Sequence, residues 1–327
     1  MPDAADDWSA LLRGITIDIP FPTACHPGVA EAEARGRQWA EQHGLARSDE
    51  ARTRLHRGRF GQLAGRAYPA AGAALFQTTV DLMMWLFTYD DDYVDRTTPQ
   101  AARTVPTIAS AVNVLDRVRG DGVAPPFEAA FEDICGRLRE QLTAEQFARF
   151  ANGIRLALLA APVQNYRRAA AQPLTLSEYE VIRRYLGGCP PCFALIDAAN
   201  GDTLPAAEYE HPDLQQLALH ANNVVCWTND IYSLAMERSQ PGQFWNMPLV
   251  YAAHGCTPAQ ALARTVERVH GEVASFAELA ARVTPCGSTA QQRYVQGLGT
   301  WMRGLYDWTV NDTARYAPHY DPKGAST

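Results

Sequence analysis

Residues 85–95 read Trp85-Leu86-Phe87-Thr88-Tyr89-Asp90-Asp91-Asp92-Tyr93-Val94-Asp95. An apolar run leads directly into four carboxylates, and neither Gly nor Pro interrupts the stretch. The pattern therefore predicts a helix that continues through the acidic residues. Because the lead-in is apolar, we expect a buried helix that carries the carboxylates at its inner end.

The aspartates of this stretch are spaced in a way that suits a metal ion. Asp91 and Asp95 are four residues apart, so a helix places them on one face. Neighbouring carboxylates repel one another unless a cation lies between them, and carboxylate oxygen is a preferred ligand of Mg²⁺. A solvated, Asp-rich helix end is the alternative, and the cluster taken alone does not separate the two.

Length and composition limit the class of protein. The chain has 327 residues, 47% of them hydrophobic, a net charge of -7 and a pI of about 5.6. No basic stripe is present, which argues against nucleic acid as a partner. The first residues are acidic and lack the apolar core of a signal peptide, and no apolar run reaches the roughly 18 residues of a membrane span. We therefore expect a cytoplasmic protein.

The seven cysteines are irregularly spaced, as expected of reduced thiols. Two of them form the CxxC sequence Cys189-Pro190-Pro191-Cys192. A second Cys pair or a nearby His is missing for a zinc site, and the strand context of a redox motif is missing too. A structural role is the favoured interpretation of this pair.

Hydrophobic periodicity predicts an all-α chain, since alternating β-branched runs and hairpin turns are missing. We expect one domain of ten or more helices around a central apolar cavity over residues 15–316, with a flexible N-terminus (1–14) and a flexible C-terminal tail (317–327). Helical patterns cover about 27–44, 49–65, 71–97, 98–118, 127–170 (with a break near 143), 179–186, a short stretch after 191, 214–237, 257–283 and 286–312.

A second set of oxygen ligands lies late in the sequence. Asn229, Ser233 and Glu237 are four residues apart in turn, so they form one ridge along a helix. An amide oxygen, a hydroxyl and a carboxylate suit one Mg²⁺ that completes its shell with phosphate and water. An ordinary polar stripe is the alternative for this segment alone, but two such sets in one all-α chain favour metal binding.

Together these residues resemble a class I terpene synthase of the bacterial type. Asn229, Asp230, Ser233 and Glu237 match the family's (N/D)Dxx(S/T)xxxE motif, and residues 90–95 resemble its aspartate-rich motif. Residues 179–188 resemble the segment that carries the diphosphate-sensing arginine, and they place Arg184 as the sensor. Gly187 and Gly188 fall at the helix break that follows, and Arg315-Tyr316 matches the family's RY pair.

The resemblance covers residues 15–316 and leaves some assignments open. The aspartate-rich motif aligns either as Asp91-Asp92-x-x-Asp95 or with Asp90 leading; we favour Asp90 as the leading metal ligand, with Asp91 close behind and Asp95 as the distal acid. Met236 stands where many relatives have a Lys. The cation that contacts the diphosphate at that point is therefore not identified.

The resemblance implies a Mg²⁺-dependent ionisation and cyclisation of a linear isoprenyl diphosphate, with three Mg²⁺ ions around the diphosphate. Farnesyl diphosphate (C15) is our default substrate, and geranylgeranyl diphosphate (C20) is the alternative; a homodimer is plausible for such folds. Arg184, Arg315 and Tyr316 would contact the diphosphate. Aromatic faces can stabilise a carbocation, although aromatic residues at helical spacing more often pack in a core; the candidates are Phe76, Phe87, Trp227 and Trp308.

Two rival functions remain. A chain-elongating isoprenyl diphosphate synthase shares the fold, but it would carry a second aspartate-rich motif where this chain has Asn229–Glu237. A non-catalytic helical binding module explains the helices, yet it gives no reason for two metal-spaced sets of ligands. Products formed from C10, C15 and C20 diphosphates distinguish the three functions.

Overall fold

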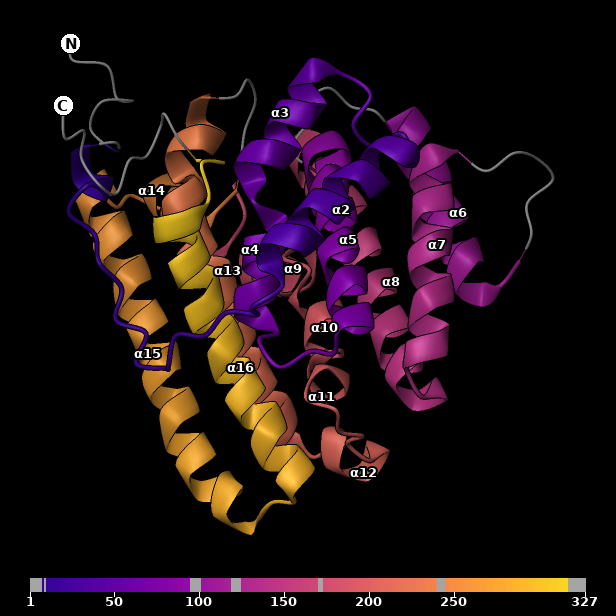
Figure 1. The fold of residues 1–327 in the computed structure, drawn as a ribbon. Coiled ribbons are helices and arrows are strands. Elements are labelled where there is room, and N and C mark those ends of the chain that lie inside the picture. Colours follow the sequence, from indigo (N-terminus) through magenta and orange to yellow (C-terminus); the bar gives the residue numbers. More distant parts are fainter. Residues whose placement is uncertain are drawn as a thin grey trace.

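The computed structural model describes residues 8, 10–94, 101–118, 125–169, 173–239 and 245–316. Within these ranges the chain consists of helices joined by turns and loops, with no strand, which confirms the predicted all-α class (Figure 1). No helix in the same ranges is both long and apolar enough to cross a membrane.

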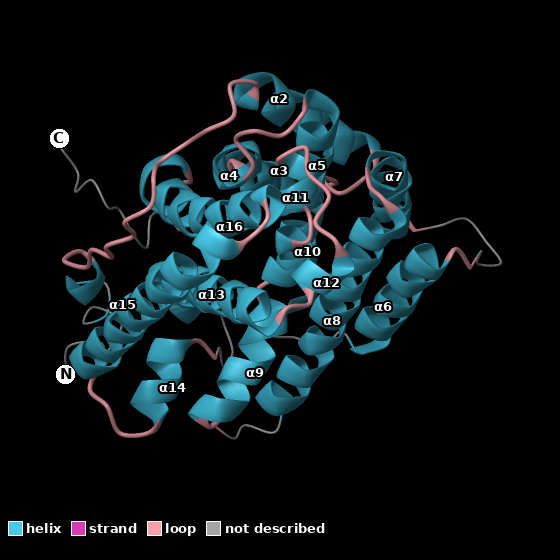
Figure 2. Cartoon of the chain, turned by 90° about the horizontal axis from the view of Figure 1, so that it is seen from below, coloured by secondary structure: helices cyan, strands magenta, loops and turns pink. Residues whose placement is uncertain are grey.

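The long helices pack side by side, and short helices fill the space between them. In Figure 1, α13, α15 and α16 lie on one side and α5, α6, α7 and α8 on the other. Seen along the bundle, α10 and α11 lie between these groups (Figure 2). The bounds are α2 (Val29–Gln42), α3 (Asp49–Gly58), α4 (Phe60–Ala67), α5 (Ala73–Tyr89), η1 (Asp90–Val94), α6 (Ala101–Asp116), α7 (Pro126–Gln141), α8 (Ala144–Ala169), α9 (Leu176–Leu186), α10 (Cys189–Phe193), α11 (Ile196–Ala199), α12 (Ala206–Tyr209), α13 (Pro212–Ser239), α14 (Met247–Ala253), α15 (Pro258–Val283), η2 (Thr284–Cys286), α16 (Thr289–Asp307) and η3 (Trp308–Asp312).

α5 is a central helix because its sequence is apolar on nearly every side. It packs against α2, α4 and α7. Trp85 is fully buried between the rings of Phe127 and Phe131, whose centroids lie 4.5 and 4.3 Å away, and its Nε1 donates to the Phe127 carbonyl. This stacked aromatic group fixes the end of α5 that leads into the aspartates.

The break between α7 and α8 lies where the sequence predicts it. Thr143 caps α8: its hydroxyl accepts from the Gln146 backbone N–H, and the Gln146 side chain accepts from the Thr143 N–H. Each interaction satisfies a donor that the helix start leaves free. The prediction of two helices over 127–170 is therefore confirmed.

Two predicted helices differ from the structure. The stretch 49–65 divides at Arg59, which adopts a left-handed conformation with φ of 49°. Trp308 of η3 stabilises this break, because its Nε1 lies 2.9 Å from the Gly58 carbonyl and 3.1 Å from that of Arg59. The stretch 71–97 is α-helical only to Tyr89 and continues as the π-helical turn η1. Both departures depend on tertiary contacts or local widening that periodicity does not encode.

The packed core reaches into the N-terminal segment. Trp8 and Leu12 are buried, and the Arg238 guanidinium lies 5.6 Å from the centroid of the Trp8 ring. Trp8 and Leu12 belong to the segment 1–14, for which the sequence predicted a flexible terminus. The tail 317–327, for which flexibility was also expected, lies outside the described residues.

Candidate active site

The aspartates lie on η1, directly after the buried helix α5. In η1 the helix widens, so Asp90, Asp91 and Asp92 occupy successive positions on a turn rather than one regular α-helical face. Their side chains are 38%, 16% and 35% exposed, respectively. Asp95, expected as the distal acid, lies outside the described residues.

Two arginines from distant parts of the chain neutralise these aspartates. Arg315 is 7% exposed, and its Nη2 lies 2.7 Å from Asp91 Oδ1 and 3.3 Å from Asp90 Oδ2. Arg54 of α3 lies 3.3 Å from Asp91 and 3.5 Å from Asp92. Positive charge is therefore already concentrated around the carboxylates, where a cation would bind.

Asp90 has an altered acidity in this setting. Burial raises its pKa from 3.8 to about 6; Arg315 opposes the shift and the neighbouring Asp91 reinforces it. A carboxylate with a raised pKa gains most from a metal ion, because the cation favours the charged form.

The second set of ligands lies on one regular stretch of α13, as predicted from its spacing. Ser233 Oγ donates to Glu237 Oε1 at 2.6 Å, and Asn246 Nδ2 donates to Glu237 Oε2 at 2.7 Å. Asn229 lies two turns earlier, where its Nδ2 donates to Tyr316 Oη at 2.7 Å. The oxygen atoms of this ridge are thus oriented by hydrogen bonds before any ligand is present.

Arg183, rather than the predicted Arg184, lies at this ridge. Its Nη2 donates to Asn229 Oδ1 at 2.7 Å and its Nε to Asp230 Oδ1 at 2.9 Å. Arg184 does not line the cavity that Arg183 faces, and its Nε is buried without a hydrogen-bond partner among the described residues. Adjacent helix positions point about 100° apart, so the one-residue difference decides which arginine faces the site.

Asp230 connects α13 to α9 and α14. Besides Arg183, it accepts hydrogen bonds from Tyr179 Oη and from the Met247 backbone N–H, the latter at 3.0 Å. Its side chain is 1% exposed, and burial raises its pKa. The Asp230 carboxylate is therefore occupied by partners from α9 and α14, and it fixes Arg183 in place.

A helix break lies beside the ridge. α9 ends at Gly187, and Gly188 adopts φ of 68° before α10 begins. A Cβ atom on Gly187 would lie 2.3 Å from Cys226 Sγ, so a larger residue fits only if the Cys226 side chain moves. The break at Gly187 and Gly188 is where the sequence places it.

The segment after η3 joins the two sets of ligands. Arg315 contacts the aspartates, while Tyr316 contacts Asn229. The Arg315 guanidinium also lies 5.1 Å from the Phe87 ring centroid, and Tyr316 packs edge-on against Trp308. One short segment therefore spans the opening between η1 and α13.

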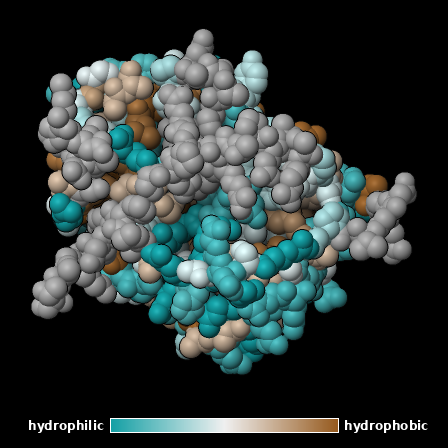
Figure 3. All heavy atoms as spheres, turned by 90° about the horizontal axis from the view of Figure 1, so that it is seen from above, coloured by the Kyte–Doolittle hydropathy of each residue, from teal (hydrophilic) through white to brown (hydrophobic). Residues whose placement is uncertain are grey.

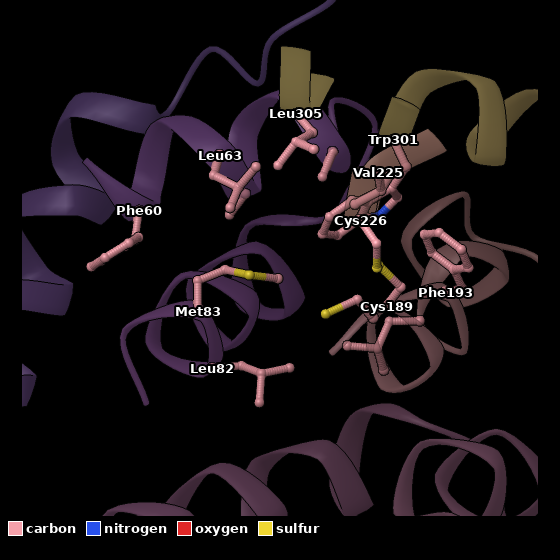
Figure 4. Close-up of a cluster of buried hydrophobic side chains, with 14 of the residues drawn as sticks. Phe60, Leu63, Leu82, Met83, Cys189, Phe193, Val225, Cys226, Trp301 and Leu305 are labelled. Atoms are coloured by element: carbon pink, nitrogen blue, oxygen red, sulfur yellow. The ribbon is translucent and has the colours of Figure 1, made fainter. Parts of the chain in front are cut away.

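A single cavity contains residues of both sets. It is lined by Asp90 on one side and by Asn229, Ser233 and Glu237 on the other. α5 and α13 both end toward the upper end of the molecule in Figure 1, and Figure 3 looks down on that end, where the described surface is mainly hydrophilic. Below this mouth the walls are mostly apolar and include Phe87. Figure 4 shows five further apolar residues of the wall: Leu63, Met83, Val225, Trp301 and Leu305.

Of the four aromatic candidates, only Phe87 lines this cavity. Phe76 stacks on His26, Trp227 lies against Arg268, and Trp308 packs at the break between α3 and α4. Tyr89, which the sequence did not single out, does line the cavity, and its Oη donates to the Leu158 carbonyl. That carbonyl has no helical donor because Pro162 lacks an N–H.

The donor set fits a hard cation that also binds a phosphate. Among the described residues, no group of three or more His, Cys, Asp or Glu could hold a metal ion by itself. The η1 set offers carboxylates alone, and the α13 set offers one carboxylate with an amide and a hydroxyl oxygen. Each leaves positions for water and phosphate oxygen, as Mg²⁺ commonly requires. Asp90, Asp91, Asn229, Ser233 and Glu237 are the residues that would hold it.

Besides Tyr89, sequence reasoning missed three polar residues that the structure brings to the site. It favoured Arg184 over Arg183, and it did not identify Arg54 and Asn246, which lie on other elements than the ligands they contact. Only the N-cap signature of Asn246, which accepts from the Leu249 N–H at the start of α14, could have drawn attention to it. Its contact with Glu237 is not visible in the sequence.

Comparison with known proteins agrees with this geometry. A protein-family profile described as "Terpene synthase family 2, C-terminal metal binding" matches residues 81–275. The chain is 45% identical to the (+)-corvol ether B synthase/(+)-corvol ether A synthase of Kitasatospora setae, with 92% of this chain and 94% of that protein covered. It is 30% identical to the (+)-T-muurolol synthase of Roseiflexus castenholzii, over 91% and 92% of the two chains.

The fold comparison leads to the same class. The crystal structure of linalool/nerolidol synthase from Streptomyces clavuligerus superposes with a TM-score of 0.80 at 25% identity, covering 90% of this chain and 100% of that one. The fold and the paired ligand sets define a class I terpene synthase, a lyase. This chain belongs to the terpene synthase family.

Proposed function

We propose that the protein catalyses the Mg²⁺-dependent ionisation and cyclisation of farnesyl diphosphate to a cyclic sesquiterpene, with release of diphosphate. One observation carries the proposal: Asp90 and the Asn229–Glu237 ridge line the same mouth of one largely apolar cavity. A charged head and a long hydrocarbon tail are the two parts of an isoprenyl diphosphate, and the mouth and the walls match them in polarity.

The substrate assignment rests on the relatives. The corvol ether and T-muurolol synthases are both named as (2E,6E)-farnesyl diphosphate cyclizing, as is the 4-epi-cubebol synthase of Streptosporangium roseum at 28% identity. The C15 diphosphate therefore takes precedence over the C20 alternative.

The basic residues at the mouth would hold the diphosphate. Arg183 and Arg315 reach the mouth from opposite sides, and charge-assisted hydrogen bonds from arginine suit phosphate oxygens. We assign the diphosphate contact to Arg183 in place of Arg184, because only Arg183 lines the cavity. Tyr316 adds a hydroxyl beside Asn229.

Metal charge would stabilise the leaving diphosphate and so assist cleavage of the C–O bond; the sequence resemblance implies three Mg²⁺ ions. Arg315 and Tyr316, which bridge η1 and α13, would exclude water from the cavity during this step. Inside, the faces of Phe87 and Tyr89 would stabilise the allylic cation.

The test is incubation of the purified protein with Mg²⁺ and, separately, the C10, C15 and C20 diphosphates, with products identified by mass spectrometry and NMR. We expect a cyclic C15 product, and no product when EDTA is present. Longer prenyl diphosphates formed with added isopentenyl diphosphate would instead show chain elongation. Absence of turnover with all three substrates would contradict a catalytic function.

A further inference from the structure

Two thiols face each other in the wall of the cavity. Cys189, the first residue of α10, and Cys226 of α13 have their Sγ atoms 3.9 Å apart. Figure 4 shows both sulfur atoms directed into the space opposite Met83. The sequence drew attention to Cys189 as half of a CxxC pair with Cys192, but its neighbour in space is Cys226.

The pair is buried in the protein yet borders the cavity. Both residues are 2% exposed and both line the cavity. A small molecule that enters the cavity can therefore approach the sulfur atoms from the cavity side. No other pair of cysteine sulfurs approaches within hydrogen-bonding distance in the described part of the chain.

The two thiols differ in acidity. The hydrogen bond shared with Cys189 lowers the pKa of the Cys226 thiol; burial opposes this shift and the nearby Arg183 adds to it. The same hydrogen bond, together with burial, raises the pKa of Cys189. The thiolate is the reactive form, and the Arg183 guanidinium, whose Nη2 donates to the Cys226 carbonyl, lies beside Cys226. We therefore assign Cys226 as the nucleophile of the pair and Cys189 as the thiol that resolves it.

We propose that Cys189 and Cys226 form a redox-modification site at which a small hydroperoxide, entering through the cavity, joins the two sulfurs in a disulfide and reversibly inactivates the enzyme. The Cys226 thiolate attacks the peroxide O–O bond, which gives a sulfenic acid and releases an alkoxide that takes up a proton. The Cys189 thiol then displaces the sulfenic hydroxyl. In sum, two thiols and one hydroperoxide yield one disulfide, one alcohol and one water.

The site's surroundings explain why the bond would inactivate. The sulfurs must approach from 3.9 Å to about 2 Å. Cys226 Sγ already packs against Gly187, where no Cβ fits, and it contacts the Arg183 carbonyl at 3.7 Å. Drawing Cys226 and Cys189 together therefore displaces the end of α9, which carries Arg183. A displacement of about 1 Å in positioning groups lowers turnover by about 100-fold.

The experiment treats the full-length protein with hydrogen peroxide, alkylates remaining thiols under denaturing conditions and maps peptides without reduction. We expect a Cys189–Cys226 crosslink and loss of two alkylated thiols. Dithiothreitol should restore both thiols. A crosslink between Cys189 and Cys192, or full alkylation of Cys189 and Cys226 after treatment, would overturn the proposal.

Cys192 supplies the matched control. It lies on the same short helix and lines the same cavity, but burial raises its pKa to about 12. Cys192→Ser should leave the crosslink intact, whereas Cys189→Ser and Cys226→Ser should each abolish it. If a serine variant does not fold, as judged by circular dichroism, crosslink mapping in the wild type and in Cys192→Ser still decides the question.

The effect on turnover rests on the proposed function, but the crosslink does not. We expect oxidised enzyme to lose about 100-fold in kcat with farnesyl diphosphate and to recover it on reduction. A mapped disulfide with unchanged turnover would overturn the inactivation. Reduced enzyme that turns over no isoprenyl diphosphate would contradict the proposed function and leave the crosslink result standing.

Discussion

The two ligand sets are held in opposite ways. On α13, Ser233 donates to Glu237 along a regular helix, and Asn246 at the start of α14 donates to the other Glu237 oxygen. On η1 the helix is widened, and the aspartates are paired with Arg54 and Arg315 from remote parts of the chain. Ser233 and Glu237 are thus oriented by nearby residues and Asn229 by neutral or singly charged hydrogen bonds to Arg183 and Tyr316, whereas the η1 set depends on tertiary ion pairs that a metal ion must replace.

The largest expected effect is a loss of activity, and substitutions in either set of metal ligands should cause it. Asp90→Ala combined with Asp91→Ala, and separately Asn229→Ala, should each lower kcat by about 1000-fold, because loss of metal-mediated charge stabilisation costs several kcal/mol. Steady-state kinetics with farnesyl diphosphate measures this. Near-normal turnover in either variant would remove that set from the site.

The free energy of unfolding should fall by different amounts when the two sets of ligands are substituted. In the metal-free protein, replacing Asp90 and Asp91 by Ala leaves Arg315 buried without its partners. We expect a loss of about 2 kcal/mol, less than for a fully buried pair because water reaches Asp90. Asn229→Ala should cost less, since Arg183 loses the Asn229 oxygen but keeps its ion pair with Asp230. Urea unfolding of both variants in EDTA provides the comparison, and equal losses would contradict it.

A substitution at Asn246 tests whether the Glu237 carboxylate is oriented before Mg²⁺ binds. Asn246→Ser keeps a hydroxyl oxygen that can cap α14, but its side chain is too short to donate to Glu237. We expect Mg²⁺ affinity to fall about 10-fold to 100-fold, as when other groups that orient metal ligands are lost. Calorimetric titration with Mg²⁺ and inorganic diphosphate measures the change. Asn246→Ala, which also loses the cap, should additionally lower the unfolding temperature.

The pH dependence should come from the η1 set. Since the pKa of Asp90 is raised to about 6, this carboxyl is protonated in the metal-free protein below that pH and must release a proton to bind Mg²⁺. Affinity should therefore fall as pH decreases through 6, by about tenfold per pH unit. The same titration at several pH values tests this, and Asp90→Asn should flatten the dependence.

The smallest effect is expected at Arg54. Its side chain is 30% exposed, and its pairing with Asp91 and Asp92 competes with a cation. Arg54→Gln should strengthen Mg²⁺ binding by about twofold to fivefold, in line with the modest energy of a partly exposed ion pair. High salt should reduce the difference between variant and wild type. Weaker Mg²⁺ binding would show that Arg54 supports the site instead of competing for it.

Sequence reasoning predicted the parts of the molecule that periodicity and local spacing encode. The all-α class, the break near Thr143 and the ridge Asn229–Glu237 follow from patterns within one helix or one turn. The choice between Arg183 and Arg184 does not, because it depends on how α9 rotates against α13. Arg54 is likewise out of reach, since its partners lie on η1 and nothing near residue 54 identifies them.

The bridging segment has a consequence for biosynthesis. The Ala314 backbone N–H donates to the Arg57 carbonyl, and the Arg57 Nε donates to the Ala314 carbonyl. Trp308, Arg315 and Tyr316 reach α3, η1 and α13 in turn. Residues of α3 and η1, which are synthesised early, therefore gain these contacts only after the C-terminal residues have been synthesised. A nascent chain that has emerged only through α15 already contains every proposed magnesium ligand, but its aspartates still lack the Arg315 guanidinium, so the pocket acquires its closing contacts only when translation has passed residue 316.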